Sequence, residues 1–380
     1  MKKLLVLSCL VLGLAVCMGL PAGAATEDRA EVQAEIESGA DMPDRARRVL
    51  LRARTKREEG DAVGAARVLD DWLTGHPGRD HHLLRFERAL DRLALDQPDS
   101  ALADLQRAVE REPRFARAWL KLGETAYGQG RYILAAQGFG RGWGLTPEPD
   151  PELLHYQGVC LLLGGKADQA VAVLASLIRD HRSRAELDWY RALIAADLES
   201  TRPGAAASLL DGMVEDFASD PRAWILASEY ASSRQQYKAG AVYLTVADYL
   251  EPLPADRLRR LGDLYAACGV PLQAARCYTR AVASAPVVAE RDTSSVRLWR
   301  EDQERLASTW LAAHRPDAAR AVLQAAVEAD PDFGRGYLLL GYSALQLDRP
   351  DQARKDLLKA RSFAGQAEEA SRLLQFLEGP

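Results

Sequence analysis

The chain has 380 residues, a formal net charge of −5 and 27% charged side chains. The acidic balance, in a sequence without a basic stripe, excludes a protein that binds nucleic acid through its phosphates. Arginine greatly outnumbers lysine, but the arginines are scattered among Asp and Glu at helix-surface spacings. We therefore interpret the high arginine content as a genomic composition bias, with the arginines on solvated helix faces and not in an anion-binding site.

The first segment of the chain has the pattern of a secretory signal. Two lysines precede an apolar run over residues 4–20, and small residues at 22–24 form a cleavage site. This order is typical of a cleaved signal peptide over residues 1–24, with a mature chain that begins at Ala25. Residues 25–45 then form a polar lead-in segment. We expect a periplasmic or secreted protein.

Two alternatives to cleavage stay open. The apolar run approaches the length that spans a bilayer, which would retain the signal as an anchor. Residues 14–17 loosely resemble a lipoprotein attachment site at Cys17, although Val16 fits that site poorly. No other segment of the sequence is long and apolar enough to span a membrane.

Beyond the lead-in, small residues recur at a fixed interval, each early in the second helix of an amphipathic helix pair. Most steps are about 34 to 36 residues, a period typical of helical repeat arrays. Prolines that would end the second helices follow the same period. First helices also carry a small residue, because we expect the helices of a pair to cross too closely for a branched side chain. The second-helix positions are Ala65, Ala101, Ala135, Ala170, Ala206, Gly240, Ala274, Ala319 and Ala353; the prolines are Pro77, Pro113, Pro147, Pro252, Pro286 and Pro331; the first-helix positions are Gly123, Gly158, Ala192, Ser228, Gly262, Ala307 and Gly341.

The same spacing divides the rest of the chain. Repeats 1–7 cover residues 46–288, and repeats 8–9 cover residues 300–365. One step of the small-residue series is about eleven residues too long for the period. We therefore place an insertion at residues 289–299, with the next first helix beginning around Arg300. Residues 366–380 carry leucines on one side and charges elsewhere, which predicts a helix that caps the last repeat.

The order of residues within one copy identifies the type of repeat. Residues 116–149 contain, in this order, an aromatic residue, a Leu-x-x-Gly-like stretch, a turn, Ala, a large apolar residue and Pro. This pattern resembles a tetratricopeptide repeat. The resemblance covers residues 46–365 and is weakest over 46–79, where Arg52 stands at a usual apolar position, and over 185–220. It implies an all-α, right-handed superhelical solenoid of about nine helix pairs with a C-terminal capping helix. We expect a monomer, because each repeat contacts only its neighbours.

No pattern points to catalysis, a cofactor or a metal. His76, His81 and His82 cluster at a turn but lack the spacing of a zinc site. The glycine string over 138–144 fails as a phosphate loop, because Trp143 replaces the third glycine and the string lies in a helix. Nucleophile motifs are absent. We predict a non-enzymatic protein without cofactor or metal, whose free and buried thiols are Cys160, Cys268 and Cys277.

The resemblance implies that the first helices line a binding groove. Apolar and aromatic groups dominate the first half of the groove-facing set and charged groups the second half. This order suits an extended peptide or helix that is held by anchors and oriented by polar contacts. Chaperone-tail binders of the family use Lys and Asn where this chain has Leu120 and Glu124, so that function is not expected. The predicted groove residues are Phe86, Leu90, Leu120, Glu124, Tyr127, His155, Trp189, Glu229, Arg259, Asp263 and Tyr342.

These features lead to a functional expectation. The chain would be a periplasmic scaffold or adaptor that mediates protein–protein contacts in a bacterial envelope complex. Polysaccharide export and outer-membrane assembly are narrower options that rest on fold and compartment alone. A receptor for glycans or phage particles stays open and would be favoured by glycan-array binding. A haem-protein (cytochrome c) assembly factor also stays open and would co-purify with an apocytochrome.

Overall fold

The computed structural model describes residues 42–283 and 293–378. The predicted signal peptide and most of the lead-in lie outside these ranges, so the structure does not bear on them. The chain divides into two compact units, residues 1–213 and 214–380. Among the described residues every regular element is a helix, and none of the helices is long and apolar enough to cross a membrane.

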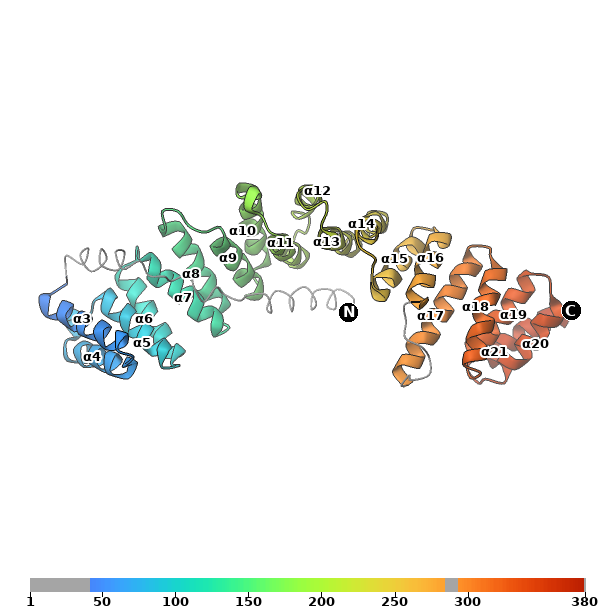
Figure 1. Ribbon diagram of the computed structural model, residues 1–380, viewed down its shortest axis with the longest axis horizontal. Coiled ribbons are helices and arrows are strands. Elements are labelled where there is room, and N and C mark those ends of the chain that lie inside the picture. Colours follow the sequence, from blue (N-terminus) through green and yellow to red (C-terminus); the bar gives the residue numbers. More distant parts are fainter. Residues whose placement is uncertain (1–41, 284–292, 379–380) are drawn as a thin grey trace. The chain divides into compact units, whose positions relative to one another are not determined.

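Unit 1 contains a series of helices in which, from α3 to α11, each packs against the next along the chain (Figure 1). Short 3-10 turns at Pro77–Arg79 and Arg182–Arg184 follow two of the second helices. The helices are α3 (Asp44–Glu58), α4 (Ala62–Gly75), α5 (His82–Ala94), α6 (Pro98–Arg111), α7 (Ala116–Gly128), α8 (Tyr132–Leu145), α9 (Glu152–Leu163), α10 (Ala167–Asp180), α11 (Leu187–Glu199) and the first part of α12 (Ala207–Asp216).

Unit 2 repeats this arrangement and ends with a single helix. Leu374 of that last helix is buried against α19 and α20, and Leu373 and Leu377 pack around it, as expected for a cap. The helices are α13 (Pro221–Ser233), α14 (Tyr237–Leu250), α15 (Ala255–Ala267), α16 (Pro271–Ala283), α17 (Thr293–Ala312), α18 (Pro316–Ala329), α19 (Gly334–Gln346), α20 (Pro350–Arg361) and α21 (Ala367–Glu378). The predicted all-α array of helix pairs with a C-terminal cap is confirmed.

The small-residue positions form the seams between helices. All nine predicted second-helix positions are buried, from Ala65 to Ala353, and so are all seven first-helix positions. Ala206 differs from the prediction in its placement, because it directly precedes α12 instead of lying within it. Among the glycines of these seams, Gly138 has backbone atoms nearest to it: a Cβ there would lie 2.5 Å from the backbone nitrogen of Gly123 and 2.7 Å from the carbonyl oxygen of Trp119 on α7. Here two backbones touch, as the sequence predicts.

Five of the six predicted prolines lie in the described part of the chain. Each stands two residues beyond the end of a second helix: α4 ends at Gly75, α6 at Arg111, α8 at Leu145, α14 at Leu250 and α18 at Ala329. Pro286 lies outside the described residues. Because proline cannot continue a helix without losing a backbone hydrogen bond, these positions fix where each pair stops.

The turn inside most pairs contains a residue in the left-handed backbone region. Glycine occupies it four times, and larger residues occupy it four times. Glycine adopts this conformation freely, whereas other residues are strained by about 1 kcal/mol or more. Because only half of these positions are glycine, the sequence alone does not reveal the regularity. The positions are Gly60, Gly130, Gly165, Gly269, Asp96, Gln235, His314 and Asp348.

The start of α17 differs from the sequence prediction, and the segment before α12 contains a contact that the sequence did not predict. The first helix of the eighth pair, expected from around Arg300, already includes residues 293–299 of the predicted insertion. Trp299 packs against the α17–α19 core near Phe333, with 6.2 Å between ring centroids, so this extension has packing partners that a count of repeat lengths cannot show. The irregular segment before α12 is held by the buried Asp197 carboxylate, which accepts hydrogen bonds from the backbone N–H of Gly204 and Ala205.

Candidate functional site

The predicted groove residues all lie on first helices, but they differ in exposure. Phe86, His155 and Trp189 are buried, with 3%, 5% and 3% of their surface exposed. The expectation that these three face an open groove is therefore corrected: they pack inside the array. Leu90, Leu120, Glu124, Tyr127, Glu229 and Arg259 are half-buried, and Asp263 and Tyr342 are exposed.

Phe86 packs against the chain that leads into the next pair. Its ring meets Phe115 edge to face, with 5.0 Å between centroids, and the guanidinium of Arg117 lies 5.4 Å from its centre. Aromatic pairs in this geometry contribute about 0.5–1.5 kcal/mol beyond the area that they bury. Phe86 thus stabilises the junction between α5 and α7 and offers no free surface.

His155 and Trp189 are brought together by a carboxylate that the sequence analysis did not single out. Glu152, at the start of α9, accepts a hydrogen bond from the Trp189 indole at 3.0 Å, and its other oxygen lies 2.9 Å from His155 Nδ1. Burial acts to raise the pKa of Glu152, but the hydrogen bonds from His155 and Trp189 outweigh it and hold that pKa below its usual value. The cluster ties α9 to α11. The i, i+3 spacing of Glu152 and His155 was the available sequence signal.

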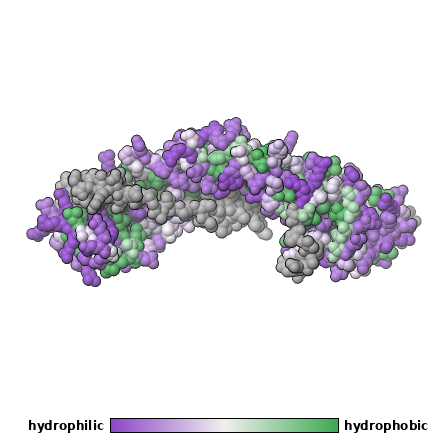
Figure 2. Space-filling model, viewed as in Figure 1, coloured by the Kyte–Doolittle hydropathy of each residue, from purple (hydrophilic) through white to green (hydrophobic). Residues whose placement is uncertain are grey.

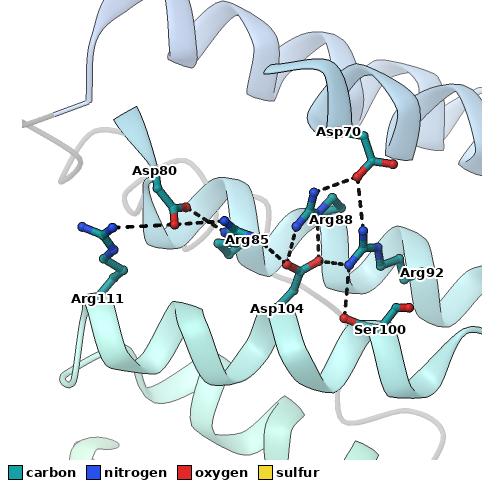
Figure 3. A network of polar contacts seen from close by, with 8 residues as sticks. All are labelled: Asp70, Asp80, Arg85, Arg88, Arg92, Ser100, Asp104 and Arg111. Carbon is teal, nitrogen blue, oxygen red and sulfur yellow. Dashed lines mark hydrogen bonds and ion pairs between the residues drawn. The ribbon is translucent and has the colours of Figure 1, made fainter. Parts of the chain in front are cut away.

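A second polar cluster shows that some arginines of unit 1 are buried and paired with carboxylates. Arg88 of α5 is 6% exposed, and Asp104 of α6 is 1% exposed. The Asp104 carboxylate accepts hydrogen bonds from Arg85 at 3.0 Å, from Arg88 at 2.5 and 2.8 Å, and from Arg92 at 2.7 Å (Figure 3). Asp70 of α4 accepts from Arg88 and Arg92 as well. For Arg85, Arg88 and Arg92, the interpretation as arginines on solvated helix faces is wrong.

The same kind of contact joins α3 to α5. Glu87 and Asp91 are buried on α5, and Arg57 donates to both carboxylates at 2.5 Å. Arg54 also pairs with Glu87. Burial raises the pKa of Asp91, although the hydrogen bond from Arg57 opposes this shift. Because breaking one partner of a buried pair leaves an uncompensated charge, the loss of a single member of this set should weaken the packing of α3 on α5.

The described residues contain no cluster that could perform metal chemistry, since no group of three His, Cys, Asp or Glu side chains converges among them. Cys160 and Cys277 are buried free thiols, and Cys268 is partly exposed. Burial raises the pKa of Cys160 to about 12 and that of Cys277 to about 11. Thiols of this kind are protonated at neutral pH and react poorly as nucleophiles.

An accessible surface with the character of a binding site lies in unit 2. Tyr342 of α19, 42% exposed, borders a groove of about 260 Å³ between α17, α19 and α21. Leu311 and Leu339 lie beneath the groove and are each only 8% exposed, and Leu373 adds partly exposed apolar surface. Ser308 and Glu369 are polar and exposed at its edge. Figure 2 shows hydrophobic surface in this part of unit 2, around α18 and α19. A tyrosine anchor beside an apolar floor with polar edges is the arrangement that holds peptide segments.

Helix pairs packed in series, with small-residue seams and an exposed aromatic groove, define a helical-repeat protein of the interaction-scaffold class. Family models described as Tetratricopeptide repeat match residues 86–148, 152–183 and 305–367. Together with the fold, these matches show that the chain is a tetratricopeptide-repeat protein. Repeats of this family typically serve as non-catalytic scaffolds for protein interactions.

Several solved structures are similar to this chain. The structure of Naa15/Naa10 bound to HypK-THB is 12% identical with a TM-score of 0.48, and the match covers 97% of this chain and 65% of that chain. The C-terminal part of a TPR repeat-containing protein from Cytophaga hutchinsonii is 11% identical with a TM-score of 0.46, covering 67% and 99%. PilW, a type IV pilus biogenesis factor, is 17% identical with a TM-score of 0.35, covering 53% and 92%. Likeness at this level carries no argument about partners. No curated protein matches the sequence.

Proposed function

We propose that this protein is an exported scaffold that binds an extended segment of a partner protein in the groove beside Tyr342. The observation that carries the proposal is the groove itself, because a tyrosine side chain lies half-exposed next to the apolar side chains of Leu311 and Leu339. Tyrosine supplies a large contact area with few rotatable bonds, and such residues dominate binding energies at interfaces.

The proposed location is the periplasm of a bacterial envelope. Its support is the order of charged, apolar and small residues over 1–24, which lies outside the described residues. Within the envelope, a complex for polysaccharide export or outer-membrane assembly suits an exported scaffold, and this narrower proposal rests on fold and compartment only. We also propose that the scaffold is monomeric, because repeats satisfy one another along the chain.

The groove is tested by placing a photo-crosslinking phenylalanine analogue at position 342 in cells that produce the protein. Tyr249 provides the matched control, since it is also a tyrosine of unit 2 and is 90% exposed but does not line the groove. We expect a crosslinked partner from position 342 and not from position 249. With that partner purified, Tyr342→Ala should weaken binding by roughly 2 kcal/mol, about thirtyfold. Equal crosslinking from both positions, or unchanged affinity of the alanine variant, would refute the groove.

Export is tested separately by fractionation and by the mass of the mature protein. We expect the protein in the periplasmic fraction, with a mass that corresponds to a chain beginning at Ala25. An unprocessed chain in the membrane fraction would support a retained anchor. A processed chain that carries lipid at Cys17 would support the lipoprotein alternative. Recovery in the cytoplasm would refute export and leave the groove proposal standing.

A further inference from the structure

A second groove lies at the other end of the described chain, between α3 and α4. Its volume is about 780 Å³, and it is lined by five basic side chains and two acidic ones. Arg45, Arg48 and Arg52 stand three and four residues apart on α3 and therefore share one face of that helix. Figure 2 shows a mainly hydrophilic surface with small apolar areas over these two helices.

The charge of this groove is not neutralised locally. Lys56 pairs with Asp61 at 2.7 Å. Within the described ranges Arg45, Arg48 and Arg52 form no ion pair, in contrast to the arginines of α5, which are bound by carboxylates (Figure 3). Arg67 lies near enough to Asp61 to help lower the pKa of that carboxyl. Three unpaired guanidinium groups along one groove produce a local positive field in a chain whose net charge is −5.

The groove also has an apolar side. Val49 and Val68 are half-buried in it, and Trp72 is 8% exposed. The Trp72 indole N–H is buried and has no hydrogen-bond partner among the described residues. A buried donor without a partner destabilises the fold, so a ligand that supplies an acceptor would relieve this cost. A suitable occupant therefore carries carboxylates and apolar side chains together, as an acidic peptide does.

We propose that residues 26–41 of this same chain bind in this basic groove. Only their sequence enters the argument, because they lie outside the described residues. They contain six acidic residues and one basic residue, together with Val32 and Ile36; the acidic residues are Glu27, Asp28, Glu31, Glu35, Glu37 and Asp41. Their composition complements both the arginines and the valine and tryptophan surface of the groove.

Tethering favours this occupant over a separate acidic peptide. Residue 41 is joined to the start of α3 at Asp44 through Met42 and Pro43, and a short tether gives an effective concentration in the millimolar range. The 15 residues of α3 span about 22 Å, and sixteen residues of chain reach farther than this when extended. The proposal goes beyond the proposed function and does not depend on it, since it concerns the other unit.

Hydrogen exchange of the full chain tests the contact. We expect exchange in α3 and α4 to accelerate by about tenfold in the charge-reversed variant Glu31→Lys/Glu35→Lys/Glu37→Lys, as the loss of three surface ion pairs implies. Peptides from α7 and α8 in the same sample serve as the internal control and should not change. The three substitutions lie before α3 in the sequence and change none of the described helices, so we expect the variant to keep its fold.

A charge swap makes the test specific. Reversal of the groove by Arg45→Glu/Arg48→Glu/Arg52→Glu should produce the same acceleration, and combining both reversals should restore protection. A synthetic peptide of residues 26–41 should bind the charge-reversed variant Glu31→Lys/Glu35→Lys/Glu37→Lys and not the unmodified chain. Unchanged hydrogen exchange of α3 and α4 in the variant Glu31→Lys/Glu35→Lys/Glu37→Lys would overturn the proposal. Equal binding of the peptide to both chains would also overturn it and assign the groove to an acidic segment of another protein.

Discussion

Two glycines of α8 should respond in opposite ways to the same substitution. Gly138 and Gly144 lie in one helix, and alanine is the better helix former at both positions by about 0.5–1 kcal/mol. A Cβ at Gly144 meets nothing within 4 Å, whereas one at Gly138 would lie 2.5 and 2.6 Å from the nitrogen and Cα of Gly123. The obstacle at Gly138 is backbone, so relief requires α7 and α8 to move apart.

The expected magnitudes follow from these contacts. Gly144→Ala should stabilise α8 by about 0.5 kcal/mol, because the position lies in the last turn, where propensity matters least. Gly138→Ala gains a similar propensity but suffers overpacking of about 1–3 kcal/mol, so the net effect should be a loss of about 1–2 kcal/mol. Hydrogen exchange of α8 amides is the suitable assay, because long repeat arrays depart from two-state unfolding. A shift in the same direction for both variants would show that the seam adapts and that the steric argument is wrong.

Three further predictions concern a turn, an ion pair and a buried aromatic. Gln235 has φ of 61°, so Gln235→Gly should stabilise its helix pair by about 0.5–1 kcal/mol in denaturant unfolding. The control Gly130→Ala should lower the free energy of unfolding by about 1 kcal/mol. A lower free energy of unfolding in both variants would contradict the expected backbone strain at Gln235. A hydrogen bond from Arg280 holds the pKa of Asp248 below its usual value, so the ionised Asp248 stabilises unit 2 above about pH 4, and this stabilisation is lost as the pH falls further. Asp248→Asn should therefore flatten this part of the acid-unfolding curve of unit 2. An unchanged curve would show that the ionisation of Asp248 does not contribute to the acid unfolding. Trp189→Ala should lower stability by about 3–5 kcal/mol because the side chain is 3% exposed, and a well-folded variant with unchanged melting would mean that the residue is not part of the core.

The sequence was sufficient for the architecture because steric constraints repeat. A small residue is required wherever two helices meet closely, and a proline just beyond a second helix cannot continue it, so Gly123 and Pro147 signal the same helix pair independently. The left-handed turns were not predictable, because residues such as Gln235 and Asp348 tolerate that conformation at a cost that the sequence does not display. Periodicity therefore predicts the seams better than the turns.

The candidate site was less accessible to prediction. Helical phasing placed Tyr342 and Trp189 on first helices, but it did not distinguish an exposed side chain from one covered by a neighbouring helix. That difference depends on Glu152, whose carboxylate fixes the Trp189 indole from another helix. The buried pairing of Arg88 with Asp104 was missed for a related reason, since both belong to charged patterns that are usually solvated.

The carboxylate of Asp104 limits which repeats of this array could be replaced by other repeats. In an array held by hydrophobic seams alone, one repeat could replace another, since each seam needs only a small residue and apolar neighbours. Asp104 instead accepts from three arginines of α5, and two of those also reach Asp70 on the preceding pair. A transplanted or duplicated repeat would leave part of this set buried and unpaired. We therefore expect the first two repeats to tolerate exchange only as one unit.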